Sequence, residues 1–148
     1  MAALANILAL LSISIPLSPF TTRLHFIQLP ILLAGVLGGV WVGAVAGGLG
    51  AVIMSSQVGI PFIIGSNAIL GGVAGYLTRR RVRPFLASSV GILAQLPYVA
   101  VTDLLYLQWP IVQVILVKLA LEGLVSAGIV SLIVRSTAVR TLTSGLRI

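Results

Sequence analysis

The sequence of 148 residues contains no cysteine, one histidine and only two acidic residues. Without cysteine the chain forms no disulfide and offers no thiolate to a metal. The single histidine, His25, cannot build a metal site alone. One histidine with two acids supplies no catalytic triad and no relay of ionisable groups across a membrane. We therefore expect a protein that is not an enzyme and that has no cofactor or resident metal.

Charged residues of both signs are scarce as well. They make up 7% of the chain, while 59% of the residues are hydrophobic and the mean hydropathy is +1.20. Soluble domains carry about 25% charged residues, so this chain cannot cover a globule with polar side chains, and lipid must surround most of it. In a soluble protein the net charge of +7 would suggest nucleic acid. In a membrane protein it reflects basic cytoplasmic loops, and we expect no nucleic-acid partner.

Proline, glycine and charge divide the apolar sequence into about six helices, each close to the length that a membrane span requires. The first apolar stretch has no basic n-region and no small-residue cleavage site, so we interpret it as a retained helix and not as a signal peptide. Only glycines separate the second helix from the third. The prediction is an all-α, polytopic membrane protein, with a single transmembrane domain over residues 1–148 and helices at 2–16, 27–39, 40–55, 62–78, 85–103 and 111–135.

The distribution of arginine predicts the orientation of this bundle. With six helices both termini lie on one side, and seven arginines fall on that side. The opposite side holds only Arg23, and Lys118 lies within the last helix. This bias predicts cytoplasmic termini in the plasma membrane, with the loops 17–26, 56–61 and 104–110 facing outward. The seven are Arg79, Arg80, Arg81, Arg83, Arg135, Arg140 and Arg147.

Glycines recur at a spacing of four residues in the second to fourth predicted helices. One row is Gly35, Gly39, Gly43 and Gly47, and a second pair is Gly71 and Gly75. Such rows let helix backbones approach closely in lipid, and we interpret them as packing surfaces. The glycines do not belong to a nucleotide-binding motif, because no Gly-Lys-Ser/Thr and no soluble βαβ unit accompanies them.

The polar residues inside the predicted helices are the candidates for a binding site. Lys118 and Glu122 lie four residues apart on one helix face. Charges at this depth face a cavity or each other, so the pair is either a salt bridge that fixes packing or a contact to a polar substrate. Asn67 is either a helix–helix hydrogen bond or a ligand contact, and Asp103 is either a solvated helix end or a further anchor. We expect Gln95 to bond the carbonyl that the nearby Pro97 leaves free.

Aromatic residues gather near the outer ends of the last two predicted helices. Tyr98, Tyr106 and Trp109 fit an interfacial belt, and they fit equally a surface that stacks on a ring-shaped ligand. Arg23, His25 and Gln28 end the first outer loop. They either reach into the membrane interface or belong to a loop that caps a site.

Four segments together resemble the substrate-binding S components of energy-coupling factor (ECF) transporters, the vitamin and micronutrient importers of prokaryotes. The first is a short helix with Ala5 and Ala9 in an Ala-x-x-x-Ala pattern. The other three, in chain order, are FIQLPILLAGVLGGVWVGAVAGGLG at 26–50, GIPFIIGSNAILGGVAGYLTRR at 59–80 and EGLVSAGIV at 122–130.

The resemblance implies six helices with both termini inside and an outward pocket lined by the last three helices under the first outer loop. It also implies a membrane coupling subunit, which Ala5 and Ala9 would contact, and two cytosolic ATPases. The chain lacks the extended N-terminal segment and the multiple histidines of the metal-specific members. Nickel and cobalt are therefore not expected substrates.

Taken with the resemblance, these residues predict high-affinity binding of a small water-soluble nutrient, a vitamin or related heterocycle, from outside the cell. The chain would be the substrate-specific subunit of an ATP-driven importer whose partners hydrolyse ATP. Two alternatives stay open, namely a structural or assembly membrane protein without a ligand and a self-sufficient small secondary transporter. The predicted substrate-binding residues are Lys118, Glu122, Asn67, Asp103, Tyr98, Tyr106, Trp109, His25 and Arg23.

Overall fold

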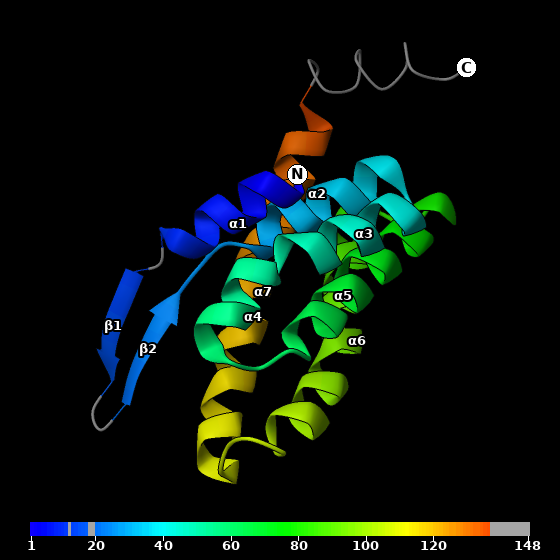
Figure 1. Ribbon diagram of the computed structural model, residues 1–148. Coiled ribbons are helices and arrows are strands. Elements are labelled where there is room, and N and C mark those ends of the chain that lie inside the picture. The colour runs from blue at the N-terminus through cyan, green and yellow to red at the C-terminus, as the bar shows by residue number, and fades with distance from the viewer. Residues whose placement is uncertain (12, 18–19, 137–148) are drawn as a thin grey trace.

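The protein is a helical bundle with one small β-hairpin, as a computed structural model shows (Figure 1). The structure describes residues 1–11, 13–17 and 20–136, and it describes side chains for 1–11 and 25–136. In chain order the elements are α1 (Ala2–Leu10), β1 (Ile13–Leu17), β2 (Phe20–Leu24), α2 (Gln28–Gly38), α3 (Val40–Gly50), α4 (Val52–Val58), α5 (Ile63–Arg79), α6 (Pro84–Asp103) and α7 (Trp109–Arg135).

Three of the helical segments are long and apolar enough to cross a membrane. They are Val40–Val58, which joins α3 and α4, Pro84–Asp103 and Trp109–Arg135. These segments confirm the prediction of an apolar helical protein and indicate a membrane protein. The helix α2, with 11 residues, extends only about 16 Å and cannot span a bilayer by itself.

The N-terminal region differs from the prediction of a helix at 2–16 followed by a loop. The helix α1 ends at Leu10, and β1 and β2 then pair as an antiparallel hairpin with Ile13 opposite Leu24. Isoleucines alternate with other residues in β1, and Pro16 follows them. Branched residues in alternation favour a strand, and a proline interrupts a helix. The hairpin lies beside the bundle below α1 (Figure 1).

The predicted helix at 40–55 is interrupted at Ala51 because a side chain from α1 enters its hydrogen-bond ladder. In an uninterrupted helix the N–H of Ile53 would bond the carbonyl of Leu49. Here the side-chain amide of Asn6 forms hydrogen bonds with both groups. Its nitrogen donates to the Leu49 oxygen at 2.9 Å, and its oxygen accepts from the Ile53 nitrogen at 3.1 Å. Insertion of a side chain into the ladder is a recognised cause of helix breaks. These two hydrogen bonds also connect α1 to the junction of α3 and α4.

The rows of glycine pack helix backbones against each other, as predicted. A Cβ atom at Gly43 would collide with the backbone carbonyl of Gly71, and one at Gly47 would collide with that of Asn67. Gly39 has a φ of 84° and separates α2 from α3, which confirms the predicted boundary there. The close contact of α3 with α5 sets the position of Asn67.

The two ends of the bundle differ in charge. Arg83 and Arg135 line one crevice between the start of α6 and the end of α7, and Arg79 at the end of α5 bonds the Gly38 carbonyl at 3.4 Å. The connections α4–α5 and α6–α7 lie at the opposite end (Figure 1). We call these the arginine end and the connection end. Between them the buried core includes Ile31, Leu32, Leu70, Ile92 and Val130.

Candidate functional site

A cavity of about 310 Å³ lies between the start of α2, the helices α4, α5, α6 and α7, and the segment that follows β2. It belongs to the connection end, because Ile60 and Phe62 from the α4–α5 connection and Leu107 from the α6–α7 connection line it. Its volume is at the lower limit of the range of roughly 300–1,000 Å³ found for small-molecule sites. Most of the wall is apolar, and the polar side chains that line it are His25, Gln28, Ser66, Asn67, Gln95, Thr102, Asp103, Lys118 and Glu122.

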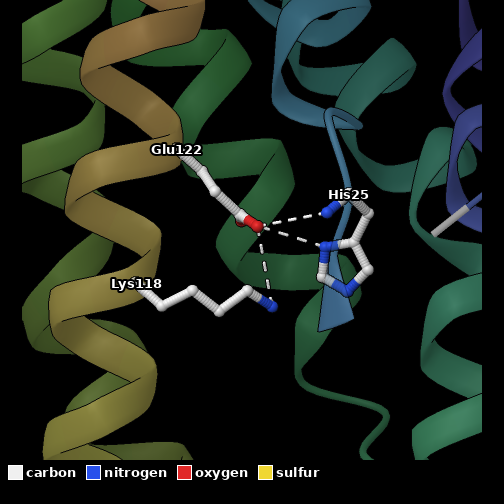
Figure 2. A network of polar contacts seen from close by, with 3 residues as sticks. All are labelled: His25, Lys118 and Glu122. Carbon is white, nitrogen blue, oxygen red and sulfur yellow. Dashed lines mark hydrogen bonds and ion pairs between the residues drawn. The ribbon is translucent and has the colours of Figure 1, made fainter. Parts of the chain in front are cut away.

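Glu122 on α7 is the centre of a polar cluster at this cavity (Figure 2). Its carboxylate accepts a hydrogen bond from the backbone N–H of His25 at 3.1 Å. The His25 Nδ1 atom lies 3.9 Å from one carboxylate oxygen, and the Lys118 Nζ atom lies 3.8 Å from the other. Buried charges need partners of this kind. The cluster therefore joins the chain leaving the hairpin to the middle of α7.

The amide side chains around the cavity carry buried polar atoms that the described part of the protein does not hydrogen-bond. The nitrogen of the Asn67 amide donates to the Ile63 carbonyl at 2.9 Å, but its Oδ1 atom has no such partner. The same is true of Gln95 Oε1 and of both amide atoms of Gln28. Most buried polar groups in proteins are hydrogen-bonded, and leaving one unpaired costs about 1–3 kcal/mol. Their concentration at one cavity is what a site for a polar solute requires.

Asp103 is the last residue of α6 and only 6% exposed. Its backbone carbonyl accepts hydrogen bonds from the N–H groups of Tyr106 at 3.0 Å and Leu107 at 2.8 Å, which closes the turn toward α7. Its carboxylate has no ion pair with any basic side chain that the structure describes. No three His, Asp or Glu side chains in the described ranges form a group suited to a metal ion.

The structure brings five of the predicted site residues together at this cavity, namely His25, Asn67, Asp103, Lys118 and Glu122. The two interpretations of Lys118 and Glu122 are compatible, because both residues pair with each other and line the cavity. The side chain of the sixth predicted polar residue, Arg23, lies outside the described residues.

The three aromatic residues do not line the cavity, in contrast to the stacking role predicted for them. The Tyr98 hydroxyl packs against Gly65 on α5. Tyr106 is half exposed and packs against Phe62, with ring centroids 6.1 Å apart. Trp109 is 50% exposed at the start of α7. Their positions fit the interfacial belt, which was the other interpretation.

Ala5 and Ala9 are also placed differently from the docking role that the resemblance implies. They are 0% and 1% exposed and belong to the core. A Cβ atom at Gly50 would lie 2.8 Å from the Ala5 side chain, so this face of α1 already packs on α3. The exposed large hydrophobic side chains of α1 are Leu4, Ile7 and Leu10.

The sequence analysis did not include Gln28 and Gln95 among the predicted substrate-binding residues, since it placed Gln28 at the end of the first outer loop and gave Gln95 a structural role. Gln95 is 2% exposed and faces the cavity, and no hydrogen bond joins it to the carbonyl near Pro97 in the described structure. One signal was present. Gln95, Val99 and Asp103 are spaced by four residues, which places all three on one helix face, and all three line the cavity.

We compared the chain with known protein families, with characterised proteins and with solved structures, and none of them matches it.

Proposed function

We propose that this protein binds a small polar solute in the cavity, as the solute-specific subunit of an ATP-driven importer of the ECF kind. The observation that carries the proposal is the set of buried polar atoms around the cavity that have no hydrogen-bond partner in the described protein. A protein that only packs helices in a membrane would fill this space with apolar or mutually bonded side chains. The arrangement therefore favours a binding protein over a purely structural one.

The proposed orientation places the arginine end in the cytoplasm and the connection end outside. Arg79, Arg83 and Arg135 lie at the first end, and positive charge collects on the cytoplasmic side of membrane proteins. The cavity lies at the other end, so the solute would enter from outside. A multi-pass arrangement with cytoplasmic termini in the plasma membrane is part of this proposal.

Release of the solute to the cytoplasm requires a partner in this scheme. The backbone contacts between α3 and α5 and the packed core lie between the cavity and the arginine end. Opening a tightly packed core costs free energy, because packing contacts are lost. We propose that a membrane coupling subunit and two cytosolic ATPases supply it. Because Ala5 and Ala9 are internal, the exposed face of α1 is the part of that helix that a coupling subunit would contact.

Native mass spectrometry of the gently solubilised protein tests the binding function. We expect a stoichiometric metabolite that is lost from the Gln95→Ala variant. The matched control is Gln113→Ala, because Gln113 lies on α7, is exposed and does not line the cavity. A protein that carries no metabolite, with both variants folded, would support the structural alternative. Uptake of the identified solute into liposomes that contain this chain alone, driven by a proton gradient, would contradict the need for partners.

A further inference from the structure

We infer that the cavity selects a cationic or N–H-rich solute, of the chemical class of amidines and amino-substituted heterocycles, and rejects anions of the same shape. This inference rests on the proposed function and specifies the class of substrate for the same cavity. It follows from the balance of hydrogen-bond acceptors and donors and from the balance of charge around the cavity.

Among the fully buried atoms of the cavity wall that have no hydrogen-bond partner in the described protein, acceptors outnumber donors. Four buried oxygens that line it have no hydrogen-bond partner in the described protein, and one buried nitrogen shares this property, Gln28 Nε2. The orientation of Asn67 is set by its bond to Ile63, so its free atom is an acceptor. A carbonyl or carboxylate oxygen is satisfied only by a donor. The four oxygens are Gln28 Oε1, Asn67 Oδ1, Gln95 Oε1 and Glu122 Oε2.

The charges of the wall favour the same class of solute. The chain has only two acidic residues, Asp103 and Glu122, and both line the cavity. Lys118 pairs with Glu122 at 3.8 Å. Asp103 has no counter-ion among the described residues. A cationic solute would provide that counter-ion, whereas an anionic solute would add a like charge in a cavity whose wall is mostly apolar.

The position of these groups indicates how such a solute would lie. Asp103 is at the connection end of the cavity, whereas Glu122 lies between three and four turns into α7 from the start of that helix at Trp109. The amide oxygens come from α2, α5 and α6. A flat solute with its cationic group at Asp103 would present further N–H groups to these oxygens, and the apolar wall would contact its ring faces.

A matched set of three probes tests the inference on the purified protein in nanodiscs. Benzamidine is a planar cation with several N–H donors, benzoate is an anion of the same shape with acceptors only, and benzamide is neutral. Isothermal titration calorimetry measures the affinity for each probe. We expect benzamidine to bind at least tenfold more tightly than benzoate. Equal binding, or tighter binding of benzoate, would overturn the inference.

The Asp103→Asn variant removes the proposed counter-ion and nearly preserves the shape of the side chain. We expect it to weaken benzamidine binding at least tenfold and to leave benzamide binding within twofold, while Gln113→Ala changes neither. Unchanged benzamidine binding in Asp103→Asn would contradict the role of this carboxylate. If the variant does not fold, the comparison of probes on the unaltered protein still decides the inference.

The failure of this inference can be distinguished from the failure of the proposed function. One outcome is that a metabolite co-purifies with the protein and is lost from Gln95→Ala, while benzoate binds more tightly than benzamidine. This outcome would refute the inference and leave the binding function in place. If no probe binds, an anionic co-purified metabolite likewise refutes the inference alone, and a cationic one supports it. If no probe binds and no metabolite is retained, both are refuted.

Discussion

Replacing Glu122 with glutamine would remove the negative charge that lies between Lys118 and His25. The side chains of Glu122 and Lys118 are 3% and 13% exposed, so neither charge is well solvated. Glutamine keeps an oxygen that can accept the hydrogen bond from the His25 N–H, but it leaves the lysine ammonium without its counter-ion. Breaking a buried pair in this way costs about 3–5 kcal/mol. We expect about 3 kcal/mol, the lower end of that range, because Lys118 retains some exposure.

A double-mutant cycle separates the loss of the pair from the loss of each side chain. Lys118→Met alone leaves Glu122 with its two contacts to His25, and we expect it to cost about 2 kcal/mol. The double variant carries neither charge, and we expect it to cost about 2 kcal/mol as well, which makes the coupling energy about 3 kcal/mol. Unfolding in mixed micelles of a mild detergent and dodecyl sulfate, followed by circular dichroism, measures all four proteins. Costs that add within about 0.5 kcal/mol would show that the two residues do not interact.

Two further predictions follow from the packing and from the charged ends. Gly43→Ala should destabilise the protein by about 1–3 kcal/mol because its methyl group would meet the backbone of α5. The matched control is Gly48→Ala, whose Cβ atom would meet only the Ile64 side chain at 3.7 Å. This variant should stabilise the protein by up to about 1 kcal/mol. Equal effects of the two variants in the micelle unfolding assay would refute the close contact between Gly43 and α5. The chain has no cysteine, so Leu105→Cys and Ser136→Cys each introduce a single label site, at the connection end and at the arginine end respectively. A membrane-impermeant maleimide applied to intact cells should label only the first, and labelling of both or of the second alone would contradict the proposed orientation.

The long helices were predictable because their determinants are local. Pro84 starts α6, and Gly39 separates α2 from α3, as the pattern of breakers indicated. The spacing of glycines also predicted close helix contact, since small residues four apart lie on one face of a helix. The break at Ala51 was not predictable, because its cause is Asn6, which is more than forty residues away in the sequence.

The residues of the cavity were predictable in part. Glu122 and Lys118 stood out because charges inside apolar helices are costly. The glutamines did not, because an amide in a helix is equally compatible with a lipid interface, a helix contact or a cavity. The aromatic residues were assigned to the site by their position along the chain, but the direction of a side chain around its helix decides what it contacts.

Composition alone indicated a membrane protein, because a chain with 7% charged residues cannot cover its surface with polar side chains. The arginine run and the glycine rows were likewise readable in the sequence, since each depends on residues close together along the chain. Only the tertiary structure decided which faces of the helices meet at the cavity. A helix that is apolar on all sides does not reveal which face contacts lipid and which contacts protein. The structure therefore supplied the hairpin that brings His25 to Glu122 across 97 residues, the internal position of Ala5 and Ala9, and the set of polar atoms to which we assign the solute.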